Sequence, residues 1–164
     1  MRVLIVDDNP DVADSTAHLV AMWGHQTAVA YDGPAALQKA ETFPADAGLL
    51  DIGMPGMDGY TLVGYLRQQQ PADWFTAFVA ITAYSAPEVQ QRCTEAGFDL
   101  HLVKPVPPAL LKHALDTIGT AREIFRKAAY AVQRNLELKR ESRRLLAALR
   151  EEMERFGLSL SGPG

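Results

Sequence analysis

Short apolar runs alternate with amphipathic segments along roughly the first two thirds of the chain. Runs rich in Val, Ile, Leu and Ala predict strands, while the segments between them repeat their apolar residues every three to four positions, as helices do. The run over residues 75–81 is almost continuously apolar, as expected for a central parallel strand that is buried on both faces. The expected strands are residues 2–6, 26–30, 47–50, 75–81 and 100–103.

Turn and capping residues separate these runs and predict where the helices begin. Asn9-Pro10, Asp32-Gly33-Pro34 and Asp58 each combine a capping side chain with the start of a periodic segment. Five strand–helix units of this size predict a doubly wound α/β sheet. The residues expected on the buried helix faces are Val12, Leu19, Val20 and Trp23; Ala36, Leu37, Ala40 and Phe43; Tyr60, Leu62, Val63, Tyr65 and Leu66; and Leu110, Leu111, Ala114, Leu115 and Ile118.

The composition changes after Gly119. Residues 120–156 contain no Pro or Gly and are rich in Ala, Leu, Glu, Arg and Lys, which favour helix. We therefore predict one long helix of about 55 Å, at 1.5 Å per residue. The expected organisation is a domain over 1–119, a long helix over 120–156 and a frayed tail over 157–164.

The long helix carries a heptad-like stripe. Its members follow each other at alternating spacings of four and three, and Asn135 takes an a position where a buried amide fixes the register of a coiled coil. Arg134 and Lys139 would face each other in a parallel pair, and Val132, Leu146 and Met153 widen the stripe, which also suits a bundle. We favour homodimerisation over docking on another protein. The stripe is Ile124, Ala128, Ala131, Asn135, Leu138, Ser142, Leu145, Leu149, Glu152 and Phe156.

Charge and composition narrow the classes of protein. Residues 1–119 hold 6 basic and 14 acidic side chains, a net charge of −8, and residues 120–164 hold 10 and 6, a net charge of +4. Neither balance indicates nucleic-acid binding. No apolar run approaches the roughly 20 residues of a membrane span, so we expect a cytoplasmic protein without membrane contact. Cys93 is the only cysteine and cannot form an internal disulfide.

Polar side chains stand where the predicted strands end. Asp7 and Asp8 follow the first strand, Asp51 the third, Thr82 the fourth and Lys104 the fifth. The carboxyl ends of parallel strands meet at one edge, where open α/β sheets place their chemistry. Taken singly, an aspartate here can be a nucleophile, a metal ligand or a helix cap, the threonine can be a cap, and the lysine can be a surface residue. All of them at one edge favour a functional site.

In this combination and order, the motifs resemble the receiver domain of two-component response regulators over about residues 1–119. The resemblance implies a flavodoxin-like sheet with strand order 2-1-3-4-5. It also implies a Mg2+ site, in which Mn2+ can replace Mg2+, with Asp8 and Asp51 as direct ligands, the main-chain carbonyl of Gly53 as a third and Asp7 acting through water. Mg2+ suits such a site because it prefers oxygen ligands and keeps several waters.

The resemblance also assigns roles in signalling. Asp51 would accept a phosphoryl group from a sensor histidine kinase or a histidine phosphotransfer protein, Lys104 would pair with a phosphoryl oxygen, and Thr82 would donate its hydroxyl to another. Such a protein is a phosphoacceptor that assists its own phosphorylation, not a conventional enzyme. Because Gly53 has no side chain and Tyr84 is bulky, we expect slow autodephosphorylation.

The aromatic switch position of the family is occupied by His101. A histidine there can still swing inward behind Thr82, and because histidine changes charge near neutral pH, its position would depend on pH. An ordinary strand residue is an equally good interpretation of His101.

The output is less defined. Forty-five residues after the receiver are too few for a second domain of ordinary size, which favours a regulator signalling by protein contact. The alternatives are a receiver module of a hybrid histidine kinase or larger regulator, and a scaffold that is never phosphorylated. A haloacid-dehalogenase-type phosphatase would need a second aspartate where Gly53 stands.

Overall fold

Five parallel strands form one sheet in the order β2-β1-β3-β4-β5, which confirms the predicted order. The computed structural model describes residues 1–70 and 74–155, and the side-chain surroundings of 149–150 and 152–155 lie outside that description. The strands are β1 (Arg2–Val6), β2 (Gln26–Ala30), β3 (Ala47–Asp51), β4 (Ala77–Thr82) and β5 (Leu100–Val103).

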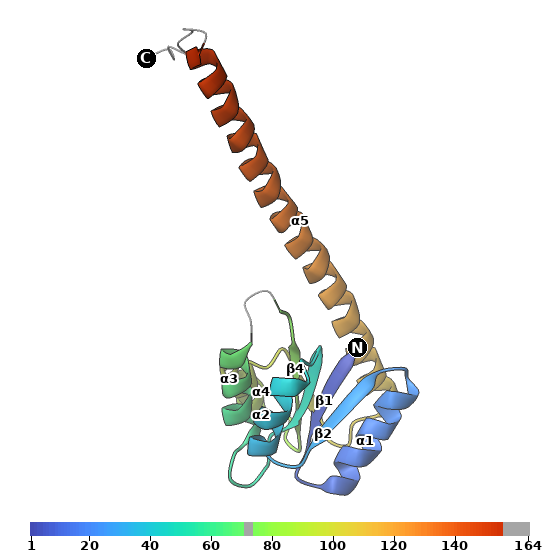
Figure 1. Cartoon of the computed structure of the whole chain (residues 1–164). Coiled ribbons are helices and arrows are strands. Elements are labelled where there is room, and N and C mark those ends of the chain that lie inside the picture. Colours follow the sequence, from blue (N-terminus) through green and yellow to red (C-terminus); the bar gives the residue numbers. More distant parts are fainter. Residues whose placement is uncertain (71–73, 156–164) are drawn as a thin grey trace. The chain divides into compact units, whose positions relative to one another are not determined.

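Helices cover both faces of the sheet (Figure 1). Alternate residues of β1 enter different cores: Val3 and Ile5 pack on one side, and Leu4 and Val6 on the other. Both sets must be apolar because both faces are covered, which explains the continuous apolar run from Val3 to Val6 in β1. One core is completed by α1 (Pro10–Met22) and the first part of α5 (Pro108–Arg155), and the other by α2 (Gly33–Thr42), α3 (Gly59–Gln69) and α4 (Pro87–Ala96).

The predicted buried face of α1 is partly wrong. Val20 is fully buried, but Val12 is 40% exposed, and the residues that pack on the sheet with it are Ala13 and Ala17. Small side chains let a helix backbone approach a sheet closely, so the apolar stripe turns towards the alanines. Tyr65 and Leu110, at the margins of two other predicted faces, are similarly exposed.

Capping side chains begin the first three helices, as predicted. Each side-chain oxygen accepts a hydrogen bond from a backbone amide in the first turn, which satisfies donors that have no partner within the helix. In Asp58 this bond is the main cause that lowers the pKa of the carboxyl. The bonds run from Asp11 N to Asn9 Oδ1 (3.1 Å), from Ala35 N to Asp32 Oδ1 (2.7 Å) and from Thr61 N to Asp58 Oδ1 (2.8 Å).

The helix after β5 does not stop at Gly119. The predicted fifth helix and the predicted long helix are one continuous helix, α5. A glycine inside a helix costs only about 1 kcal/mol relative to alanine, and Ile118, which is 3% exposed, anchors the preceding turn in the core. The chain divides into two compact units, Met1–Glu123 and Ile124–Gly164. The predicted stripe members Leu149, Glu152 and Phe156, and the predicted tail, lie outside the described side chains.

A polar network joins α5 to the amino-terminal edge of the sheet within the first unit. Arg122 Nη2 lies 2.6 Å from Asp46 Oδ1, and its Nε donates a 3.0 Å bond to the carbonyl oxygen of Phe75. The other carboxylate oxygen of Asp46 accepts a 2.7 Å bond from the backbone N–H of Arg2. The Arg122 guanidinium also lies over the Trp74 ring, 5.5 Å from its centroid. The buried Asp46 carboxylate is therefore paired from two directions.

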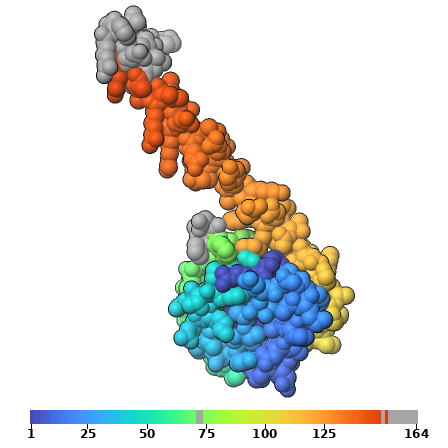
Figure 2. Space-filling view, turned by 45° about the vertical axis from the view of Figure 1, so that its right-hand side comes forward, coloured from blue at the N-terminus to red at the C-terminus, as the bar shows by residue number. Residues whose placement is uncertain are grey.

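The second unit exposes its apolar side chains over residues 124–148. Residues 124–148 are all classed as exposed, and Ile124, Tyr130, Leu145 and Leu146 each expose about two thirds of their surface or more. Figure 1 draws this segment as part of one continuous helix, and Figure 2 shows the surface of the same segment in orange. Within residues 1–70 and 74–155, no helix is both long enough and apolar enough to cross a bilayer.

Candidate functional site

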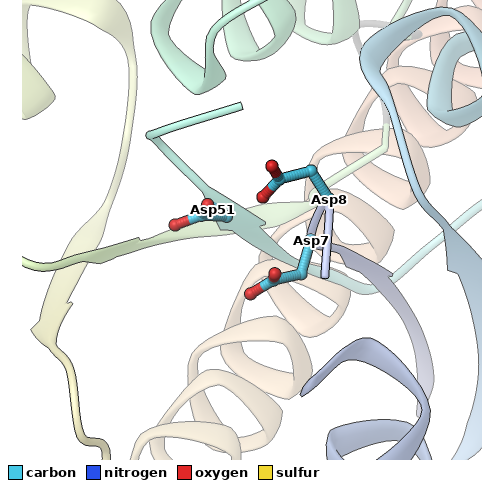
Figure 3. Close-up of side chains that lie close together, drawn as sticks. All are labelled: Asp7, Asp8 and Asp51. Atoms are coloured by element: carbon cyan, nitrogen blue, oxygen red, sulfur yellow. The ribbon is translucent and has the colours of Figure 1, made fainter. Parts of the chain in front are cut away.

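Three aspartates come together at the carboxyl ends of β1 and β3. One carboxylate oxygen from each of Asp7, Asp8 and Asp51 lies within 4.8 Å of the others, and Figure 3 shows the three side chains gathered there. Asp7 and Asp51 are buried, with 4% and 7% of their surface exposed, whereas Asp8 is exposed. The three residues, which we call the acid cluster, therefore combine two buried carboxylates with one that reaches solvent.

Backbone bonds hold the carboxylates in place. Asp7 Oδ1 accepts a 3.0 Å bond from the N–H of Asn9, and the Asp7 N–H donates to the carbonyl oxygen of Ala30 at the end of β2. Beyond Asp51, the N–H of Ile52 donates to the carbonyl oxygen of Ile81, 3.0 Å away, and continues the pairing of β3 with β4. The carboxylates thus project from backbone fixed by neighbouring strands.

Gly59 allows α3 to begin directly against Asp51. A Cβ atom at Gly59 would lie 2.4 Å from the carbonyl oxygen of Asp51 and 2.9 Å from the Cα of Ile52, which is too close for any side chain. The loop between β3 and α3 also contains Gly56, whose φ of +78° favours glycine. These two glycines return the chain to the sheet edge within a few residues of Asp51.

Lys104 bridges two members of the acid cluster. Its Nζ lies 2.8 Å from Asp7 Oδ2 and 3.0 Å from Asp51 Oδ1. Burial alone would lower the pKa of the Lys104 ammonium, but hydrogen bonds and charge attraction to Asp7 and Asp51 outweigh burial and raise that pKa above its ordinary value. The side chain is therefore a fixed positive charge beside the carboxylate of Asp51.

The loop that carries Lys104 is tied to the end of β4. The Lys104 N–H donates a 2.7 Å bond to the carbonyl oxygen of Thr82. The Lys104–Pro105 peptide bond is cis, which we did not predict from the sequence. The sequence signal for it is the proline itself, because cis peptide bonds occur almost only before proline.

Thr82 lies at the same edge and is 2% exposed. Its Oγ1 accepts a 3.1 Å bond from the N–H of Tyr84. His101 is half-buried and pairs in register with Ala80, two residues before Thr82. Because side chains alternate along a strand, His101 and Thr82 lie on the same face of the sheet, which is compatible with the predicted switch but does not test it.

The donor set fits a hard divalent cation. Three carboxylates around one point make a strongly negative site for a cation that prefers oxygen ligands. Gly53 leaves the opening unobstructed, since a Cβ there would lie 3.8 Å from the nearer Asp51 oxygen and touch nothing else within 4 Å. Asp7, Asp8 and Asp51, with the Gly53 carbonyl, are therefore the residues that would hold Mg2+.

Comparison with known proteins agrees with this arrangement. The chain matches the response regulator receiver domain over residues 3–116. The sensor histidine kinase RcsC of Salmonella typhimurium is 37% identical over 115 residues, which make up 70% of this chain and 12% of the kinase. Among solved structures, the chemotaxis protein CheY4 of Vibrio cholerae has a TM-score of 0.67 and 32% identity, covering 71% of this chain and 97% of CheY4. The BeF3-activated N-terminal receiver domain of Klebsiella pneumoniae RstA has a TM-score of 0.65 and 28% identity, covering 71% of this chain and 97% of that domain.

The family match over residues 3–116 lies within the first unit and includes the start of α5. The chain spans only 12% of the length of the kinase, so what is shared with RcsC is one part of a larger protein. The matched residues 3–116 include the acid cluster, Thr82 and Lys104. By sequence and by fold, the chain belongs to the response regulator receiver family of two-component signalling.

Proposed function

We propose that Asp51 is the phosphoacceptor of a two-component phosphorelay. The observation that carries this proposal is the acid cluster with Lys104, whose Nζ lies 3.0 Å from Asp51 Oδ1 at the functional edge of the sheet. An oxygen of Asp51 attacks the phosphorus of a phosphohistidine, the P–N bond to the imidazole breaks, and an aspartyl phosphate forms. The donor is a sensor histidine kinase or a histidine phosphotransfer protein.

The groups around Asp51 would then stabilise the negative charge on the phosphoryl oxygens. Bound Mg2+ would neutralise charge on the phosphoryl oxygens as they approach the carboxylate. Lys104 is already held beside Asp51 and supplies a second positive charge to one of these oxygens. Thr82 can turn its hydroxyl, which now accepts a bond from the Tyr84 N–H, to donate to another oxygen. His101 would then move on the face of the sheet that it shares with Thr82.

The phosphorylated state should be long-lived. Gly53 brings no side chain that could orient an attacking water. Tyr84 is held next to Thr82 by its backbone bond, and its ring, although 70% exposed, is large enough to shield the phosphoryl group. The chain itself catalyses little beyond its own phosphorylation and slow dephosphorylation.

We further propose that the signal leaves through protein contact and that residues 124–148 of α5 dimerise the chain. Their apolar side chains are exposed to water along the whole segment, and a long helix with such a stripe is stabilised by packing more than by propensity. The similarity to RcsC supports a second setting, in which the chain acts as the receiver module of a hybrid kinase.

Intact mass spectrometry with Mg2+ and a small phosphodonor tests the proposal. The wild type should gain one phosphate, Asp51→Asn should gain none, and Asp11→Asn, which changes an exposed carboxylate of α1, should behave as the wild type. Omitting Mg2+ should slow labelling strongly. If neither the donor nor candidate kinases label the wild type, the chain is instead a receiver-like scaffold.

A further inference from the structure

The charged, polar and apolar side chains in and beside the exposed stripe of α5 indicate the orientation and register in which two copies would pair. We propose that the segment 124–148 pairs with the same segment of a second copy in an antiparallel coiled coil centred between residues 136 and 137, so that residue 125 lies opposite residue 148. The proposal rests on the proposed homodimerisation and adds its orientation and register. Leu138 and Leu145 of the stripe are 45% and 67% exposed, and Val132 and Leu146 beside it are 61% and 65% exposed.

Charge at the edges of the stripe distinguishes the two orientations. In a parallel pair, each Arg134 faces Lys139 of the other copy, and these like charges repel. In the antiparallel pair, each Arg134 lies opposite Glu141 of the other copy, so that symmetry creates two opposite-charge contacts. Arg134 is only 3.5 Å from Glu137 within its own helix, with both side chains more than half exposed. That contact is weak and leaves the guanidinium able to turn towards Glu141.

Side-chain size along the stripe favours the same orientation. A parallel pair would stack Ala128 on Ala128, which gives a loosely filled layer, and Leu145 on Leu145, which gives a well-filled one. The antiparallel register places Ala128 opposite Leu145, and Ala131 opposite Ser142. Each layer then has a more even volume, as close packing requires, and the serine faces a methyl group instead of a second hydroxyl.

The polar residue within the stripe also fits. In this register Asn135 packs against Leu138 of the other copy, close to the centre of the coil. The two Asn135 side chains are offset by three residues, about 4.5 Å along the helix axis, so that each amide can hydrogen-bond to the other. A mutually satisfied amide pair favours this register, because burying either amide without a partner would cost free energy.

The residues that widen the stripe are paired better in the antiparallel coil. A parallel pair places the charged Glu141 against the apolar Leu146 of the other copy. In the antiparallel pair, Leu146 instead lies beside Phe125, and the aliphatic stem of Lys139 covers Val132. The stripe is too broad for a parallel two-stranded coil. In the antiparallel coil, the residues that widen it also contact the other copy and extend the apolar interface.

This pairing determines which parts of two chains are brought together. The two copies of Ile124 stand at opposite ends of the paired segment, 25 residues or about 37 Å apart along the axis. No residue of the acid cluster takes part, so the dimer forms whether or not Asp51 is phosphorylated. The coil is then a constitutive connector that keeps two receivers in one assembly.

Cysteine cross-linking of the full chain tests the orientation. Chains carrying Ala128→Cys and Leu145→Cys, each with Cys93→Ser to remove the native thiol and with tags of different mass, are mixed and mildly oxidised. We expect disulfides between the two different variants and almost none within either variant alone. Disulfides within each variant alone would overturn the antiparallel arrangement while leaving the dimer intact. A wild type that light scattering shows as single chains at all concentrations would overturn the dimer itself.

A charge reversal provides a second readout that does not depend on oxidation. Arg134→Glu places like charges opposite Glu141 in the antiparallel pair and should weaken dimerisation about tenfold, whereas in a parallel pair it would face Lys139 and strengthen it. Adding Glu141→Arg should restore the wild-type dissociation constant. A tighter dimer with Arg134→Glu alone would overturn the proposal.

Discussion

The helix α5 contains two regions with the same kind of sequence and opposite environments. In its first part, Leu115 is completely buried and Ile118 is 3% exposed, while further along, Ile124 and Leu145 are 65% and 67% exposed. Both parts repeat apolar residues every three to four positions. The repeat therefore shows which face of a helix must pack against an apolar surface. It does not show whether that surface belongs to the same chain or to another one. The sheet supplies it for the first part, and a second copy supplies it in our proposal.

Ion pairs differ in the same way between the two regions. Arg122 and Asp46 are 2.6 Å apart, with 24% and 11% of their side chains exposed. Arg134 and Glu137 are 3.5 Å apart, with 59% and 51% exposed. A pair held in water contributes little, whereas removing one member of a desolvated pair leaves a charge without compensation. The two ion pairs therefore differ more in their contribution to stability than their N–O distances suggest.

The largest effect should come from truncating a leucine on each part of α5. Leu115→Ala removes a fully buried side chain and should lower the free energy of unfolding by about 3 kcal/mol, whereas Leu145→Ala should change it by less than about 0.5 kcal/mol. Denaturant unfolding followed by tryptophan fluorescence measures this, because Trp23 and Trp74 both belong to the first unit. The measurement requires a dilution at which the chain is monomeric. Equal losses would mean that the second part also packs on the receiver.

An intermediate effect should come from the two ion pairs. Arg122→Met leaves the Asp46 carboxylate with only the Arg2 N–H and should cost about 2 to 3 kcal/mol of unfolding free energy. Arg134→Met is the matched control and should cost less than about 0.5 kcal/mol in the monomer. The same unfolding assay compares them. If Arg122→Met proved neutral, the network at the amino-terminal edge of the sheet would not contribute to stability.

The smallest effect should come from Gly119, after which we expected a separate long helix to begin. Because Gly119 lies inside α5 and a Cβ there would meet Met1 Sδ only at 3.5 Å, Gly119→Ala should stabilise the chain by about 0.5 kcal/mol. Gly64 lies in the interior of α3 with open space around its Cβ position, so Gly64→Ala is the control. It gives the change in stability expected when a glycine inside a helix is replaced by alanine. A loss of stability with Gly119→Ala but not with Gly64→Ala would show that α5 is broken at residue 119.

Much of the receiver was predictable because strand ends, caps and glycine turns are local features. Asp7, Asp8, Asp51, Thr82 and Lys104 were each placed at a strand end from the residues around them, and the resemblance supplied the strand order. The buried face of α1 was predicted incorrectly at Val12. The periodicity of apolar residues shows which side of a helix is buried, but not which residues at the margin of that side are exposed. Ala13 and Ala17 could be recognised as the contact residues only once the distance between helix and sheet was known.

The sequence by itself determined the five strand–helix units, the side chains that end the strands and the uninterrupted helix-forming composition after Gly119. Only the tertiary structure decided that Lys104 bridges Asp7, 97 residues away, and Asp51, and that Arg122 neutralises the buried Asp46. Periodicity and capping act between neighbours in the chain, so they can be recognised in the sequence. Contacts between distant residues depend on how the whole sheet and its helices pack, and so does the choice between burying an apolar stripe and leaving it for a second chain.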